Sequence, residues 1–327
     1  MARRALRSES RWAALALLLG CVAVLGCDGA YVNLGNSAQA LNGGDGGGGG
    51  SGGAAGDGAT GAVEAWEVSQ APLIAQVDML QLANPTLTGD QEHLYYTQQL
   101  RGGDDPHEVR VMHAVRTGDG FGGGAPVILT NDAFGEASPA ISADRSELWF
   151  SRFADVTGSD VWRATRAGDA WSGLERVAEL CSDFDDAARP PGLGGSVMPL
   201  SSKRHGGKLY QIYFAMRGAD GTWATPNQEH LSNVNSKEAL SADGFLSADG
   251  LSLYFASTRS GGADLYVAHR SSLDADFGVP EALTDLNSDY DERMPWVSAD
   301  ERTVYFASNR PGAYEQYGLY VAKKRAR

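Results

Sequence analysis

Short hydrophobic runs separated by polar turns dominate the chain from about residue 63 onward. The clearest run ends in alanine and recurs five times, with the alanines 50 to 54 residues apart: Ala114, Ala164, Ala215, Ala268 and Ala322. A cation follows each alanine by two residues: Arg116, Arg166, Arg217, Arg270 and Lys324. Runs this short and this rich in Val, Tyr, Phe and Trp predict β-strands. Their fixed period predicts an internal repeat.

Each repeat contains further strand signals. An aromatic run lies upstream of the alanine strand, as at 253–257 and 304–308, and a tight Ser-Ala-Asp turn precedes it, as at 247–250. The third copy has glycines at 192–195 instead of this turn. A fourth run follows the alanine strand, as at 223–226. Four short strands in about 52 residues are typical of a propeller blade, whose sheet is too small to stand alone.

The two ends of the repeat region complement each other. The last copy stops at its alanine strand and lacks a fourth run, whereas residues 66–75 form an orphan run that matches the missing one. We therefore predict that 66–75 is the outer strand of the final blade and closes the ring. The predicted fold is a single all-β propeller of four-stranded blades, with five blades favoured and six as the alternative.

One stretch carries a family resemblance. Residues 246–259, LSADGLSLYFASTR, resemble the WD40-like repeat of TolB-type β-propellers. The resemblance covers about residues 66–325 and is close in copies two, four and five, moderate in copy one, and confined to the second half of copy three. Many relatives have six blades. The resemblance implies a periplasmic protein-binding or scaffold role, and it does not imply catalysis.

The N-terminus predicts export. Four arginines precede an apolar run of 15 residues at 12–26, which is shorter than the roughly 20 residues that span a bilayer. The run ends in Val-Leu-Gly-Cys and resembles a bacterial lipobox, which implies lipidation of Cys27. A lipobox at Cys21 and an ordinary signal or uncleaved anchor are the alternatives. The predicted organisation is a signal peptide at 1–26, a lipidated and flexible tether at 27–62, and the propeller at 63–327.

Charge limits the partners. The chain carries 27 Lys and Arg against 41 Asp and Glu, a formal charge of -14. Without residues 1–26 the balance is 23 against 40, or -17. Such a surface repels nucleic acid and anionic headgroups. We therefore expect a monomer, attached to the cell envelope by its lipid alone, whose partner is an envelope protein or peptide with basic character. The choice between inner and outer membrane stays open.

The sequence offers no signature of a nucleophile, and we expect no cofactor and no metal. Cys181 is interpreted as a small buried residue, because no His at fixed spacing could activate it. Residues 285–292 have the alternating oxygens of a calcium loop, but Tyr290 replaces the expected Gly and Trp296 the expected Glu. An acidic loop between blades is therefore favoured over a calcium site.

Charged residues repeat in the loops that we expect at the channel mouth. Acids precede the inner strands and arginines follow the aromatic strands: Glu136, Asp186, Glu238, Glu292, Arg152, Arg204, Arg259 and Arg310. One interpretation is a rim that binds a protein or peptide. The other is salt bridges within blades, such as Arg152 with Asp160 and Arg259 with Asp264. A glycan hydrolase with channel carboxylates is the alternative function, and the similarity of the repeats speaks against it.

Overall fold

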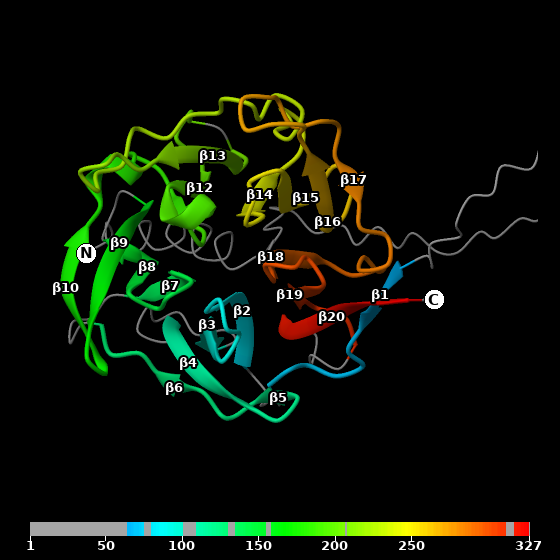
Figure 1. Cartoon of the computed structure of the whole chain (residues 1–327), viewed down its shortest axis with the longest axis horizontal. Coiled ribbons are helices and arrows are strands. Elements are labelled where there is room, and N and C mark those ends of the chain that lie inside the picture. The colour runs from blue at the N-terminus through cyan, green and yellow to red at the C-terminus, as the bar shows by residue number, and fades with distance from the viewer. Residues whose placement is uncertain are drawn as a thin grey trace, which may run out of the picture.

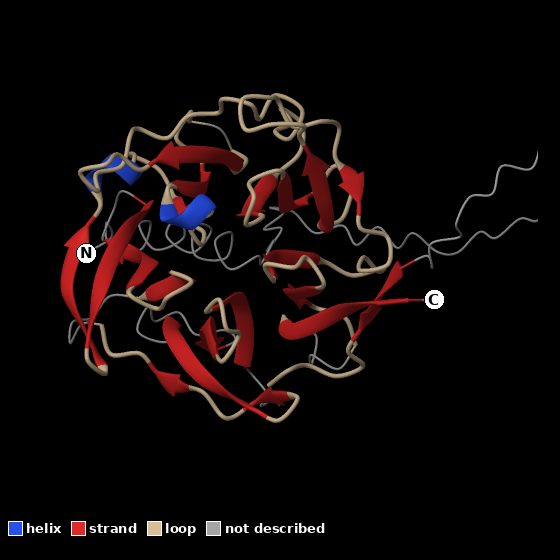
Figure 2. Cartoon of the chain, viewed as in Figure 1, coloured by secondary structure: helices blue, strands red, loops and turns tan. Residues whose placement is uncertain are grey.

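The computed structural model describes residues 64–74, 80–100, 109–129, 135–154, 158–206, 208–311 and 317–326. Five small antiparallel sheets stand around a central axis (Figure 1), and almost all regular structure is strand (Figure 2). The predicted all-β propeller is confirmed, with five blades. Cys27 and the tether lie outside the described residues, so the anchor stays a prediction. In the described part of the chain, no helix has the length and apolar character that crossing a bilayer requires.

The first two blades run outward from the axis in chain order. Blade 1 contains β2 (Leu80–Leu87), β3 (His93–Leu100), β4 (Val109–Thr117) and the short β5 (Gly120–Phe121) and β6 (Ala125–Pro126). Blade 2 contains β7 (Glu136–Ile141), β8 (Glu147–Ala154), β9 (Gly158–Ala167) and β10 (Ala170–Arg176).

The third blade departs from the repeat, as its weak sequence match predicts. It contains β11 (Asp186–Ala188), β12 (Val197–Ser202) and β13 (Gln211–Met216), with 3-10 turns η2 (Ala178–Leu180) and η3 (Leu193–Gly195) before its inner strands. Blade 4 contains β14 (Ser241–Leu246), β15 (Ser252–Ser257), β16 (Asp264–His269) and β17 (Glu281–Ala282).

The fifth blade joins the two ends of the chain. It contains β18 (Glu292–Val297), β19 (Thr303–Ser308), β20 (Gly318–Ala326) and, as its outer strand, β1 (Glu64–Val68). Trp66 lies opposite Lys324 in this antiparallel pair. Past the end of β1, the Leu73 amide still donates to the Leu319 carbonyl at 2.7 Å. The predicted closing strand is confirmed, and its pairing begins two residues earlier than predicted.

The repeated cation after each alanine packs on an aromatic ring of the outermost segment of its own blade. The five pairs, with cation to ring-centre distances of 4.6 to 6.0 Å, are Arg116 on Phe121, Arg166 on Trp171, Arg217 on Trp223, Arg270 on Phe277 and Lys324 on Trp66. In four blades the ring follows the cation in sequence. In blade 5 it comes from the other end of the chain, so closure restores the common contact.

Neighbouring blades share their hydrophobic cores. One cluster joins Leu82 and Tyr96 of blade 1 to Trp296 and Tyr305 of blade 5, all at most 5% exposed. Each blade thus buries its faces only because another blade covers them, as expected for a repeat that cannot fold alone.

Candidate functional site

The eight predicted rim residues lie on the face where inner strands begin. Glu292, the first residue of β18, is fully buried, and its amide donates to the Ala263 carbonyl of blade 4 at 2.7 Å. Its carboxylate accepts from the Ser288 amide (2.9 Å), the Ser288 and Ser308 hydroxyls (2.7 and 2.8 Å), and Arg310 Nη2 (2.9 Å). Arg310 also donates to the Leu286 carbonyl at 2.7 Å. This network ties the loop before the blade to its first hairpin.

Blade 3 repeats the network. Asp186, the first residue of β11, is also fully buried. It accepts from the Ser182 amide (2.6 Å), the Ser182 hydroxyl (2.7 Å) and Arg204 Nη2 (2.9 Å). Arg204 donates in turn to the Leu180 carbonyl at 2.8 Å. The predicted acids and arginines therefore meet in pairs within blades.

Blade 4 uses a hydroxyl in place of the acid. Ser241 is the first residue of β14 and lies opposite Ser257, as Glu292 lies opposite Ser308. Arg259 donates to the Val234 carbonyl at 2.6 Å and lies 3.4 Å from the Ser241 hydroxyl. Glu238, which the sequence places with the acids, is instead an exposed loop residue.

Blade 2 departs from this network in the position of its arginine. Glu136 and Arg152 lie opposite each other at the first hairpin and are 8% and 7% exposed. Arg152 occupies the position in β8 that Ser308 occupies in β19, two residues before the position of Arg310. It packs on the Trp162 ring at 4.8 Å. Asp160 binds Arg176, at 2.7 and 2.8 Å, in place of the pairing with Arg152 that the sequence suggests.

The other pairing suggested from the sequence, Arg259 with Asp264, is also replaced. Arg259 donates to the Val234 carbonyl, and Asp264 accepts from the Ser260 hydroxyl.

A second set of residues converges on the axis itself. Four inner strands contain a bulge whose first looped-out residue has a positive φ: Asn84 (52°), Ser138 (51°), Asp243 (58°) and Met294 (59°). Pro follows three of them and Gly the fourth. Because Pro and Gly interrupt ladder pairing, the bulge turns one side chain per blade toward the axis.

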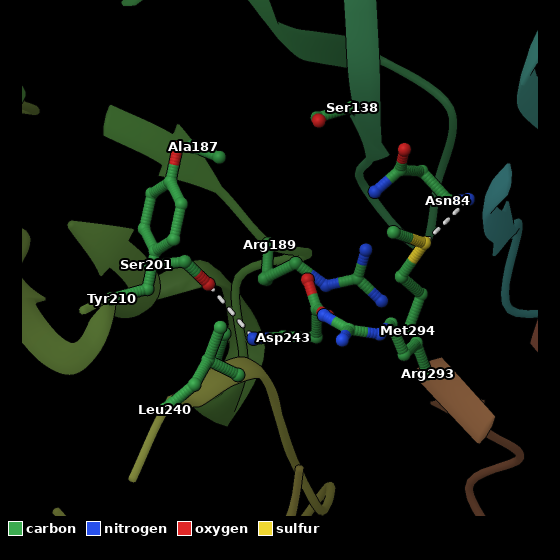
Figure 3. Close-up of a pocket in the computed structure, with 11 residues that line it drawn as sticks. Asn84, Ser138, Ala187, Arg189, Ser201, Tyr210, Leu240, Asp243, Arg293 and Met294 are labelled. Carbon is green, nitrogen blue, oxygen red and sulfur yellow. Dashed lines mark hydrogen bonds between the residues drawn. The ribbon is translucent and has the colours of Figure 1, made fainter. Parts of the chain in front are cut away.

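These side chains line a central cavity of about 20 Å³ together with Arg189 of blade 3 and Arg293 of blade 5. Figure 3 shows the two guanidinium groups at the centre, beside Asp243, with Asn84 and Met294 on one side and Tyr210 on the other. Arg189 and Arg293 are 1% and 4% exposed. Arg189 Nη2 donates to the Pro295 carbonyl at 2.9 Å, which links blade 3 to blade 5 across the ring.

The opposite face carries an apolar hollow of about 490 Å³. Its floor consists of the last residues of four inner strands: Leu87, Ile141, Leu246 and Val297. Its accessible wall includes Leu193 and the small turn residues Ala143, Ala248 and Ala299. We call this depression the apolar hollow. Since the inner strands begin at the predicted rim and end here, the two features occupy opposite faces of the ring.

Acidic turns surround the apolar hollow. In four blades the turn after the inner strand exposes an aspartate: Asp90, Asp144, Asp249 and Asp300. Hydrogen bonds from residues of their own turns lower the pKa of all four carboxyls. Glu147 also lines the hollow, and it is held by Arg163 and Arg217 at 2.8 to 2.9 Å.

Potential nucleophiles and metal ligands are few. The Cys181 thiol is half-buried and donates to the Val177 carbonyl at 3.2 Å, and burial raises its pKa to about 12. It is therefore a thiol and not a thiolate at neutral pH. Within the described ranges, no three His, Cys, Asp or Glu side chains are grouped so as to hold a metal ion.

Neither the central cavity nor the apolar hollow is among the features predicted from the sequence. A signal for the cavity is present in the sequence: Ala83-Asn84-Pro85, Ala137-Ser138-Pro139 and Met294-Pro295 recur with the period of the blades, and Arg189-Pro190 stands in the third copy. The hollow has no comparable signal, because its floor residues look like ordinary core positions at strand ends.

Comparisons with known proteins identify the fold and no more. No family model and no curated protein matches the chain. A protein of unknown function from Dyadobacter fermentans is similar in structure, with a TM-score of 0.53 and 10% identity over 80% of this chain and 99% of that one. Zg3597, a family 117 glycoside hydrolase of Zobellia galactanivorans, has a TM-score of 0.52 and 11% identity over 80% and 90%. TolB from Acinetobacter baumannii has a TM-score of 0.43 and 16% identity over 75% and 54%.

Proposed function

We propose that the chain is a lipid-anchored protein of the bacterial cell envelope whose propeller binds a protein or peptide segment in the apolar hollow. The single observation that carries this proposal is the hollow itself, a depression of about 490 Å³ with an apolar floor at the mouth of the channel. Pockets of this size with an apolar lining and a few polar groups are the usual form of a binding site.

The surroundings of the hollow indicate the partner's chemistry. Hydrogen bonds within their turns lower the pKa of Asp90, Asp144, Asp249 and Asp300, which favours the carboxylate form of each side chain. An apolar floor inside an acidic ring suits a segment that presents apolar side chains flanked by Lys or Arg. The negative net charge of the chain would also speed its encounter with a basic partner.

A glycan hydrolase is less well supported by the geometry. Such enzymes need two carboxyls at a defined separation across the bound sugar. Asp243 is the one carboxylate among the residues that line the central cavity, and the cavity is too small for a sugar. In the apolar hollow Glu147 is already bound by two arginines, and the pKa of Asp144 is lowered, which opposes a role as acid catalyst.

Site-specific photocrosslinking of the anchored chain in its own envelope tests the proposal. A photoreactive phenylalanine analogue would replace Ala248 or Ala299 in the hollow, and Asp183 or Glu238 on the opposite face. We expect a discrete adduct with an envelope protein from the hollow positions only. Adding Ala143→Arg at the hollow wall should abolish it, whereas Asp183→Asn, which changes the charge equally, should not. Adducts of equal yield from both faces, or none from the hollow, would refute the proposal.

A further inference from the structure

Buried donors without partners gather in the central cavity. Among the described residues, five buried side-chain atoms that lack a hydrogen-bond partner belong to residues that line this cavity: Ser138 Oγ, Arg189 Nε, Arg189 Nη1, Tyr210 Oη and Arg293 Nε. They come from blades 2, 3 and 5. A buried polar group without a partner is costly, so such a concentration indicates a site that something else occupies.

The charges of the cavity are unbalanced. Among the residues that line the cavity, two guanidinium groups, Arg189 and Arg293, face one carboxylate, Asp243 (Figure 3), so the lining itself has one excess positive charge. Burial raises the pKa of Asp243, and both arginines oppose this shift. Outside the lining, Asp291 forms a long ion pair with Arg293 Nη2 at 3.9 Å, and its carboxylate also accepts from the Tyr317 hydroxyl and the Ala263 amide, so the compensation that it gives Arg293 is distant. A buried charge without full compensation is strongly unfavourable.

Size and donor chemistry define the occupant. A cavity of about 20 Å³ holds one water-sized or monatomic species, since a single water needs about 10 to 15 Å³. Guanidinium nitrogens only donate, and a water accepts at most two hydrogen bonds while leaving the charge unbalanced. From these observations we infer that the central cavity is a binding site for a small monovalent inorganic anion, such as chloride, coordinated by Arg189, Arg293 and Ser138.

An anion in this position would connect the blades at the axis. Its ligands belong to three blades, and Arg189 already bonds the Pro295 carbonyl of the fifth. Because the unfolded chain has no such site, anion binding must stabilise the closed ring. This role is separate from the binding of a partner in the apolar hollow, which lies on the face opposite the predicted rim.

Thermal unfolding of the full chain in chloride and in gluconate, at equal ionic strength and pH 7.5, tests the inference. Gluconate is too large for the cavity. We expect the Tm to rise saturably with chloride, by about 5 °C at a hundredfold excess over Kd. Bromide soaked into crystals should give an anomalous peak between Arg189 and Arg293. Equal Tm values in the two salts, together with an ordered water and no bromide peak, would overturn the site.

Variants separate this site from a general salt effect. Arg189→Met should abolish the chloride dependence, whereas Arg163→Met, a matched arginine outside the cavity, should preserve it. Asp243→Asn raises the net charge of the cavity by one, and Asn tolerates the positive φ at this position. It should tighten chloride binding at least tenfold, and this readout remains if Arg189→Met fails to fold. Unchanged or weaker binding in Asp243→Asn would contradict the inference.

Discussion

At the scale of single residues, the charged groups near the first hairpins hold the blades together. The carboxylates of Glu292 and Asp186 accept from the loop before their own blade and from its first hairpin, and both residues are fully buried. The sequence shows the repetition of acid and arginine but not the seryl donors that surround the acids, because Ser182 and Ser288 look like ordinary loop residues. The repetition of an acid and an arginine is therefore the same in the sequence whether these residues form a rim that binds a ligand or a buried network within each blade.

Replacing Glu292 by Gln tests this structural role. The change leaves Arg310 buried without its anionic partner and should lower the free energy of unfolding by about 3 kcal/mol. The exposed Glu238 provides the control, since Glu238→Gln should change stability by less than about 0.5 kcal/mol. Urea denaturation of both variants measures the difference. Equal stabilities for the two variants would show that Glu292 is not a structural acid.

A histidine pair of blade 1, packed against Arg145 of blade 2, predicts a pH dependence. Arg145 Nη1 lies 2.9 Å from His93 Nε2 and, because arginine only donates, His93 must donate from Nδ1 to His113 Nε2, also at 2.9 Å. Burial, with Arg145 nearby, lowers the pKa of His113 from its ordinary 6.5 to about 4. The folded state therefore resists protonation more than the unfolded state does.

The sign of the effect follows from this lowered pKa. Stability is complete above pH 6.5, falls as the pH drops toward 4 because the unfolded chain takes up the proton first, and changes no further through this group below pH 4. Allowing for the partial exposure of His113, we expect a loss of about 1 to 2 kcal/mol. Tm values of His113→Phe should depend less on pH in this window. A slope as steep as that of His269→Phe, a control at an exposed strand end, would refute the assignment.

At the scale of elements, the contact between cation and ring defines what a complete blade is. The pair forms in every blade, and β1 supplies the ring for the last one. This part of the fold could be predicted because the five copies can be aligned with one another. The alignment shows that the last copy lacks its fourth strand and that an unmatched strand precedes the first copy. The bulged inner strands were not predicted, because turn residues and hydrophobic period do not reveal where a strand turns a side chain toward the axis, and the recurring Pro after the bulged residue is the one signal for it.

Trp66 and Trp171 allow a matched comparison of a closing and an internal strand. Both are half-buried aromatic residues that pack under a cation in the outer strand of a blade. If β1 completes blade 5 as β10 completes blade 2, Trp66→Ala and Trp171→Ala should each cost about 2 kcal/mol. Chemical denaturation measures both values. A negligible loss for Trp66→Ala beside a full loss for Trp171→Ala would mean that β1 is only loosely attached.

At the scale of the whole molecule, closure creates the features that carry the proposed functions. The central cavity and the apolar hollow are each lined by residues from all five blades. Neither can be recognised in one repeat, since each exists only where unlike copies meet. This explains why the sequence predicts the ring and its closing strand correctly, whereas the two sites become recognisable only in the closed structure.

Deleting residues 64–74 from the full chain tests ring closure most directly. The control deletes 11 residues, 45–55, from the glycine-rich segment, so that both proteins are equally shortened. Without β1 the fifth blade loses its outer strand and Lys324 its aromatic partner, so the Tm should fall by at least about 10 °C, while the control keeps the Tm of the intact chain. Equal Tm values for the two shortened proteins would contradict a propeller closed by its N-terminal strand.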